Sequence, residues 1–173
     1  CVIESQRTKL YPMLFEPNLQ TKVWGGEQLT QWKQLPEQQH IGESWEVSAV
    51  DKSPSIIANG TWAGYALTEV IKKMPQAILG KEVAKKYNNQ LPLLVKFIDS
   101  NDDLSVQVHP DDTMAQRLHS SMGKTEMWYV LDAAPSSRLV YGFALDMDRE
   151  TLQQSLDNGT VEKYLQYVPV QKD

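Results

Sequence analysis

The middle of this chain is dominated by short segments of β-branched, aromatic and other apolar residues, and this pattern constrains the fold more than any other feature. Most of these segments end at turn residues, as strands do. No strand, glycine-rich loop and helix follow one another in a regular order, which argues against a doubly wound parallel sheet. The sequence therefore predicts a mainly β fold, with strands in residues 41–50, 91–98, 104–109, 125–131 and 138–143.

Helices are predicted between these strands, which favours a jelly roll or sandwich with helical insertions. Thr68 is a candidate N-cap for one helix, which Pro75 would end. Asp111 or Asp112 can cap another helix further along the chain. The predicted helices cover residues 68–74, 80–87, 113–120, 148–156 and 161–167.

Composition excludes several classes of protein. The 173 residues carry 17 Lys and Arg against 22 Asp and Glu, a net charge of −5, which argues against a nucleic-acid partner. No apolar run approaches the roughly 18 residues of a membrane span, so no membrane partner is expected. The one cysteine, Cys1, excludes an internal disulfide and fits a cytoplasmic location. Because Cys rather than Met comes first, we expect a processed chain or a piece of a longer one.

The segment Leu104–Asp112 contains the first candidate site residues. Side chains of a strand alternate between two faces, so Ser105, Gln107 and His109 share one face. An amide oxygen and an imidazole nitrogen on one face suit a metal ion or a polar cavity. A solvent-facing edge of a sheet shows the same pattern, and alternation alone does not separate these two interpretations.

Glu126 is the next candidate, in a strand where it shares a face with aromatic and aliphatic residues. Such a carboxylate needs a metal, a cation or solvent, because burial of an unpaired charge is costly. If this strand pairs with residues 104–109, Glu126 can meet Gln107 and His109. In the alternative interpretation, Glu126 is exposed and forms an ion pair with Lys124.

Together these segments resemble the type I mannose-6-phosphate isomerases, in particular the compact bacterial members. The sequence Gln-Val-His-Pro-Asp-Asp followed by Gly-Lys-Thr-Glu is specific to that family, whereas Trp-Gly-Gly alone is weak evidence. Trp24 and Glu43 also lie in matching motifs and are interpreted as structural residues. The motifs run through most of the chain, at residues 16–18, 23–26, 42–48, 55–60, 91–97, 104–112 and 123–129.

The resemblance implies a cupin-type β-barrel that holds one zinc ion. Ser105 and Lys124 match positions that line the substrate pocket, and Lys96 is expected to point into the same cavity. Lys124 is the candidate catalytic residue, since its charge can contact the sugar phosphate or a substrate hydroxyl. The residues that match the zinc ligands are Gln107, His109 and Glu126.

A fourth zinc ligand of the family, a His in a Pro-Ala-Gly-Thr-x-His-Ala-like segment, has no match in this sequence, and neither does a family arginine. We therefore expect residues 1–173 to form one cupin-like domain, the N-terminal portion of the family's fold, with further strands after residue 173. The barrel would then be incomplete, with open edges that invite pairing. A missing C-terminal segment or a partner chain, as in a homo-oligomer, would complete it.

The resemblance implies an enzyme that interconverts mannose 6-phosphate and fructose 6-phosphate, although the chain alone can be inactive. The substrate would be a phosphorylated hexose. The alternative is a non-catalytic cupin that binds a sugar phosphate. The missing His and Arg favour it for the isolated chain, whereas Gln107, His109 and Glu126 favour the isomerase for the parent protein. A third reading is another metal cupin such as a dioxygenase, where His-x-His is usual in place of Gln107-Val-His109. The identity of the bound metal distinguishes the two enzymes, because zinc would support the isomerase and iron would support the dioxygenase.

Overall fold

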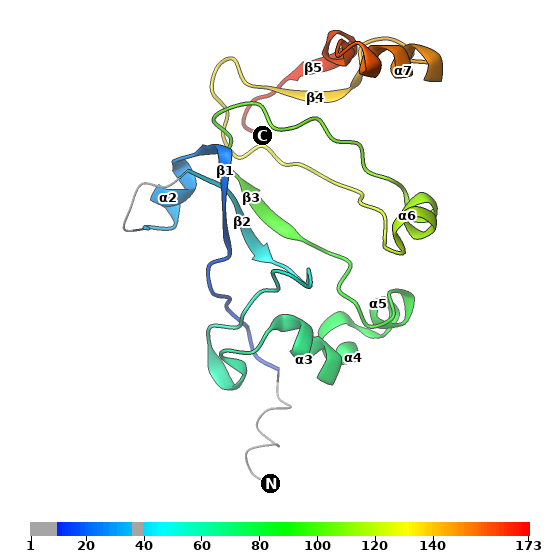
Figure 1. Cartoon of the computed structure of the whole chain (residues 1–173). Coiled ribbons are helices and arrows are strands. Elements are labelled where there is room, and N and C mark those ends of the chain that lie inside the picture. Colours follow the sequence, from blue (N-terminus) through cyan, green and yellow to red (C-terminus); the bar gives the residue numbers. More distant parts are fainter. Residues whose placement is uncertain (1–9, 36–39) are drawn as a thin grey trace. The chain divides into compact units, whose positions relative to one another are not determined.

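The computed structural model describes residues 10–35 and 40–173, so Cys1 lies outside the described residues. The chain divides into two compact units, Cys1–Leu104 and Ser105–Asp173. Each unit contains one antiparallel sheet (Figure 1). Among the described residues, no helix has the length and apolar character that a membrane span requires.

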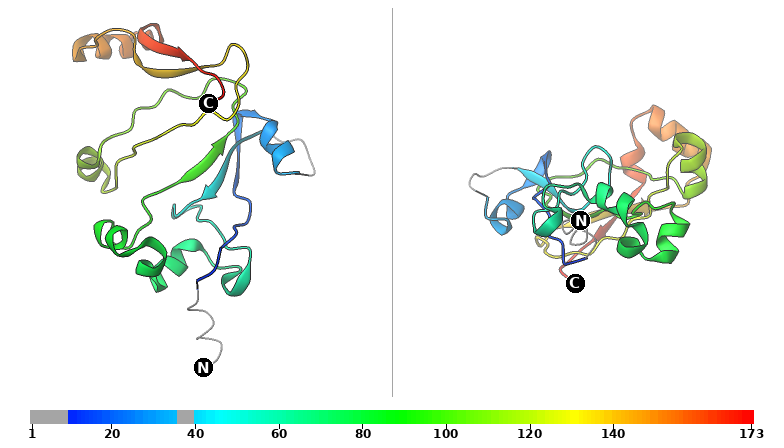
Figure 2. Two further views of the ribbon diagram at one scale, coloured as in Figure 1. Left: turned by 180° about the vertical axis from the view of Figure 1, so that it is seen from behind. Right: turned by 90° about the horizontal axis from the view of Figure 1, so that it is seen from below.

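The N-terminal unit is built on a three-stranded antiparallel sheet in the order β1–β2–β3. Its strands, which Figure 2 shows from behind, are β1 (Leu19–Gly26), β2 (Ile41–Val47) and β3 (Val95–Ile98). In the register of β2 against β3, Glu43 lies opposite Ile98 and Trp45 lies opposite Lys96. The strands predicted in residues 41–50 and 91–98 are thus confirmed over shorter ranges.

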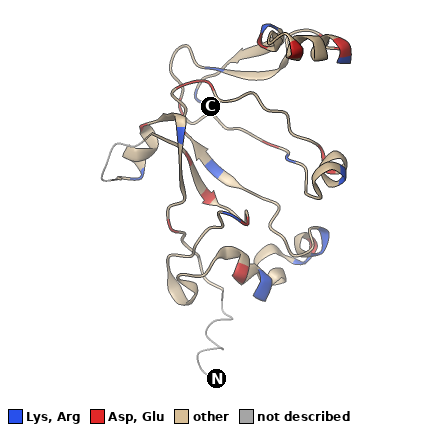
Figure 3. Cartoon of the chain, in the orientation of Figure 1, with Lys and Arg blue, Asp and Glu red and all other residues tan. Residues whose placement is uncertain are grey.

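Short helices form the connections of the N-terminal unit. They are α2 (Gln28–Trp32), the 3-10 helix η1 (Gly60–Trp62), α3 (Leu67–Lys73), α4 (Pro75–Leu79) and α5 (Lys81–Lys86). The helices predicted in residues 68–74 and 80–87 are confirmed, but Ala66 rather than Thr68 is the N-cap of α3. The Glu69 carboxylate accepts a hydrogen bond from the Ala66 N–H at 2.9 Å. Lysines in the last turns of α3 and α5, blue in Figure 3, complement the negative helix ends.

The core of the N-terminal unit forms around Ile57, Trp62 and Val70, which are almost inaccessible to solvent. Tyr11 joins the chain before β1 to this core. Its hydroxyl donates to the Asn59 carbonyl at 2.8 Å and accepts from the Trp62 N–H at 2.9 Å. The segment that leads into the sheet is therefore held by both packing and hydrogen bonds.

The C-terminal unit contains a two-stranded antiparallel sheet and two α-helices. The elements are α6 (Asp112–His119), β4 (Arg138–Phe143), α7 (Arg149–Asp157), the 3-10 helix η2 (Val161–Tyr164) and β5 (Leu165–Pro169). The Asp111 carboxylate caps α6 by accepting from the Met114 N–H at 2.7 Å, and Asp148 caps α7 in the same way. These elements confirm the strand predicted in residues 138–143 and the helices predicted in residues 113–120 and 148–156.

The helix predicted in residues 161–167 is wrong in its second half. The helical turn ends at Tyr164, and β5 begins at Leu165. Leu165 pairs with Phe143 and Tyr167 with Val140. Pairing with β4 supplies hydrogen-bond partners that a short isolated helix lacks, so tertiary contact overrides the local helical signal.

Residues 104–109 and 125–131 are not strands, contrary to the prediction. They have no regular secondary structure and lie on either side of α6 (Figure 1). Val108 and Met127 are each 91% exposed. A strand needs a hydrogen-bonded neighbour, and neither segment belongs to a sheet of the described chain. Alternation predicts which face a side chain takes once the strand is paired, but it does not supply the partner.

The predicted cupin-type barrel is not closed in the part of the chain that the structure describes. Its sheets contain three and two strands. Closure into a barrel requires every strand to be paired along both edges, which these sheets do not achieve. The coarser prediction of sheets with inserted helices is confirmed, whereas a single cupin-like domain over residues 1–173 stays a prediction.

Candidate functional site

A tight connection around α6 brings the two candidate segments of the C-terminal unit together. The Lys124 N–H donates to the Pro110 carbonyl at 3.2 Å, and the Gly123 N–H donates to the Asp112 carboxylate at 2.9 Å. A Cβ at Gly123 would lie 2.6 Å from backbone atoms of Asp111 and Asp112, so this close approach requires glycine. The chain before α6 and the chain after it are therefore held against each other.

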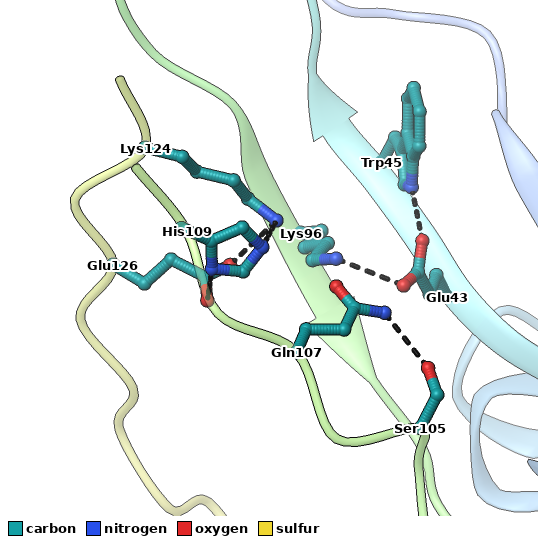
Figure 4. Close-up of polar contacts among 8 residues, drawn as sticks. All are labelled: Glu43, Trp45, Lys96, Ser105, Gln107, His109, Lys124 and Glu126. Atoms are coloured by element: carbon teal, nitrogen blue, oxygen red, sulfur yellow. Dashed lines mark hydrogen bonds and ion pairs between the residues drawn. The ribbon is translucent and has the colours of Figure 1, made fainter. Parts of the chain in front are cut away.

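His109, Lys124 and Glu126 form one cluster at this point (Figure 4). The Lys124 ammonium lies 3.0 Å from Glu126 Oε1 and 3.1 Å from His109 Nε2. His109 Nδ1 lies 3.3 Å from Glu126 Oε2. Because an ammonium group only donates, Nε2 accepts from it, which assigns the ring proton to Nδ1. The Nε2 lone pair and one carboxylate oxygen thus face a single cation.

The cluster is accessible to solutes. The exposed fractions are 25% for the His109 side chain, 30% for Glu126 and 46% for Lys124. Partial exposure weakens each ion pair to about 0–1 kcal/mol. Both interpretations offered for Glu126 are present in part, since it contacts His109 and also pairs with Lys124. An imidazole nitrogen beside a carboxylate oxygen is a donor set that zinc accepts.

Gln107 and Ser105 bind each other. The Gln107 Nε2 donates to Ser105 Oγ at 2.9 Å, and no hydrogen bond within the described chain joins Gln107 to His109 or Glu126. Residues 10–35 and 40–173 contain no group of three or more His, Cys, Asp and Glu side chains that could hold a metal. The predicted ligand set would not form such a group, because it contains one His, one Glu and an amide.

Lys96 lies in the N-terminal unit, where it forms an ion pair with Glu43 across β2 and β3 (Figure 4). Its Nζ is 2.9 Å from Glu43 Oε1, and Trp45 Nε1 donates to Glu43 Oε2 at 2.7 Å. Burial raises the pKa of Glu43, but the hydrogen bonds from Trp45 and Lys96 and the charges of Lys96 and Lys22 outweigh it. The pKa of Glu43 therefore lies below its ordinary value, and the carboxylate stays charged.

Sequence reasoning missed the contact between Glu43 and Lys96. Alternation within β2 does signal that Glu43 and Trp45 share a face. Lys96 is 53 residues further along the chain, and only the register of β2 against β3 brings it to Glu43. The sequence separation of these two residues does not reveal their contact without the sheet order.

Comparison with known proteins identifies relatives over most of the chain. The family described as phosphomannose isomerase type I, catalytic domain, matches residues 13–133. The Bacillus subtilis protein named probable mannose-6-phosphate isomerase GmuF is 39% identical over 153 residues, which cover 86% of this chain and 46% of that protein. The chain spans about half the length of the curated relatives it matches.

Solved structures are similar in fold. The crystal structure of the mannose 6-phosphate isomerase from Bacillus subtilis matches with a TM-score of 0.82 and 30% identity, covering 94% of this chain and 51% of that one. The mannose 6-phosphate isomerase from Salmonella typhimurium matches with a TM-score of 0.52 and 32% identity, over 61% of this chain and 27% of that one. That second structure is bound to fructose 6-phosphate and zinc.

Proposed function

This chain belongs to the type I phosphomannose isomerase family, and we propose that it takes part in the zinc-dependent interconversion of mannose 6-phosphate and fructose 6-phosphate. The observation that carries the proposal is the cluster of His109, Lys124 and Glu126, in which two potential metal ligands face one cation. The fructose 6-phosphate and zinc in the Salmonella typhimurium structure support a phosphorylated hexose and zinc as the ligands. The proposal includes a cytoplasmic location, which the single cysteine favours.

The proposed ligands of the one zinc ion are Gln107, His109 and Glu126. His109 would bind through Nε2, because its ring proton lies on Nδ1. Gln107 donates through Nε2, so its carbonyl oxygen would be the ligand atom. Bound zinc would act as a Lewis acid that stabilises negative charge on the sugar oxygens during the reaction.

The chain's own residues would bind and orient the sugar. The reaction moves a proton between C2 and C1 of the open-chain sugar through a cis-enediol. Lys124 is the proposed catalytic residue, because its positive charge can stabilise the substrate phosphate or an oxygen that becomes negative. Ser105 lies beside Gln107 and is proposed to hydrogen-bond the substrate. Lys96 is proposed as a substrate-binding residue on the family resemblance alone.

An isomerase assay on this 173-residue chain tests the proposal, with zinc supplied and mannose 6-phosphate as substrate. We expect His109→Ala to lose zinc and to lower turnover by more than about 100-fold, because a ligand is removed. His119→Ala, at the end of α6, is the matched control and should behave like the parent chain. Full turnover by metal-free His109→Ala would contradict the role of zinc. Binding of zinc without turnover would indicate a partial site, whose remaining ligand and catalytic groups belong to a further segment or a partner chain.

A further inference from the structure

We propose that the Lys124 ammonium is an internal cation that competes with zinc for His109 and Glu126. This inference rests on the proposed function, because it takes those two residues as zinc ligands. It concerns the metal-free chain, in which the Lys124 ammonium contacts both side chains. The competition follows from three features of the cluster, which are its contacts, its charges and its backbone.

The contacts place the ammonium on the atoms that zinc would use. Lys124 Nζ lies 3.1 Å from His109 Nε2 and 3.0 Å from Glu126 Oε1. A metal ligand must offer a free lone pair. Each lone pair that accepts a hydrogen bond from the ammonium is unavailable to zinc, so zinc must first displace the side chain of Lys124.

The charges work in the same direction. In the metal-free cluster the Lys124 ammonium lies 3.0 Å from the Glu126 carboxylate and offsets its negative charge. Once zinc is bound, the ammonium becomes a like charge close to a dication. Solvent screens this repulsion only in part, since the Lys124 side chain is 46% exposed. Lys124 therefore stabilises the metal-free state and destabilises the loaded one.

The backbone keeps the displaced ammonium near the site. The Lys124 N–H donates a hydrogen bond to the Pro110 carbonyl at 3.2 Å. The preceding residue, Gly123, packs closely against the backbone at the start of α6. The Lys124 side chain is 46% exposed, so it can turn toward solvent while this backbone contact is kept. Zinc binding would thus change Lys124 from a partner of the ligands into a free cation for the anionic group of a substrate.

Zinc affinity tests the competition directly. We would titrate the full chain against a chromophoric chelator and compare the parent chain with Lys124→Met. We expect Lys124→Met to bind zinc about three- to tenfold more tightly, in keeping with the weak ion pairs it removes. Lys163→Met, an exposed lysine of the same unit at η2, removes the same charge away from the cluster and should leave the affinity unchanged.

A second readout follows the lysine itself. Brief acetylation followed by mass spectrometry should label Lys124 at least about threefold faster in the zinc-loaded chain than in the metal-free chain, because a displaced amine is free to react. Lys163 should be labelled at the same rate in both. Circular dichroism would establish that each variant keeps the fold of the parent chain.

The outcomes separate this inference from the proposed function. Equal or weaker zinc binding by Lys124→Met overturns the inference, and so does an equal gain in Lys163→Met, which would indicate a general charge effect. His109→Ala is titrated in parallel. If it binds zinc as tightly as the parent chain, the proposed ligands themselves are wrong. If it loses zinc while Lys124→Met gains nothing, the competition alone fails.

Discussion

The neighbours of Glu43 stabilise its charged carboxylate by more than burial destabilises it. Hydrogen bonds from Trp45 and Lys96 lower its pKa below the ordinary value of 4.5, although burial acts in the opposite direction. The pKa is then lower in the folded chain than in the unfolded chain. Glu43 therefore stabilises the fold fully above about 4.5, and this contribution is lost as the pH falls through the folded value.

We expect Glu43→Gln to flatten the acid side of the stability curve. The free energy of unfolding of the parent chain should fall as the pH drops below about 4.5, and it should fall less steeply in the variant. Urea unfolding followed by tryptophan fluorescence at a series of pH values measures this slope. Asp146→Asn, at an exposed carboxylate, is the control and should keep the parent slope. An unchanged slope in Glu43→Gln would show that Trp45 and Lys96 do not stabilise the charged carboxylate in the folded chain.

At the scale of elements, α2 begins with a cap that comes from a distant part of the chain. Asp99 Oδ2 accepts from the N–H groups of Gln28 at 2.6 Å and Leu29 at 3.0 Å. A Cβ at Gly26 would lie 2.3 Å from Asp99 Oδ1, so glycine leaves room for this carboxylate. The end of β3 therefore positions the helix that follows β1, in a way that local capping patterns do not reveal.

We predict that Asp99→Ala lowers the free energy of unfolding by about 1 kcal/mol, since it leaves two helix N–H groups without their acceptor. Asp99→Asn keeps an acceptor oxygen and should cost less. Asp103→Ala, at an exposed position of the following turn, is the matched control. Urea denaturation of the purified variants gives these values. If Asp99→Ala were as stable as Asp103→Ala, the cap would have no energetic role.

At the scale of the whole molecule, the exposed apolar side chains around α6 have a consequence for association. Val108 and Met127 are each 91% exposed and Tyr129 is 67% exposed, in segments that join no sheet of the described residues. Unpaired backbone groups beside apolar side chains favour pairing with another chain.

We therefore expect the chain to self-associate as its concentration rises. Sedimentation velocity over a range of concentrations should show this, and the double variant Val108→Lys with Met127→Lys should reduce it. Leu145→Lys, at a residue that is 74% exposed but lies outside those segments, is the control. A chain that stays monomeric at every concentration would indicate that these segments are protected from pairing.

Some local features of this protein, such as helix caps and one strand, could be predicted from the sequence alone. Asp111 and Asp148 cap their helices as residue type and position indicate, because a cap needs only the next three residues. The strand in residues 138–143 was predicted from β-branched and aromatic content. The family was identified from the motif around His109 together with the Gly-Lys-Thr-Glu motif, and the family match over residues 13–133 agrees.

The sequence by itself thus determined two aspartate caps, most of the helices, the family and the residue types of the candidate site. The tertiary structure alone decided which partners these residues have. It brings Lys96 into an ion pair with Glu43, and it brings the Lys124 ammonium into contact with His109 and Glu126. It also leaves the segments before and after α6 outside any sheet of the described residues. The physical reason is that caps and alternation depend on neighbours in sequence, whereas pairing depends on a second segment that only the packed chain brings into contact.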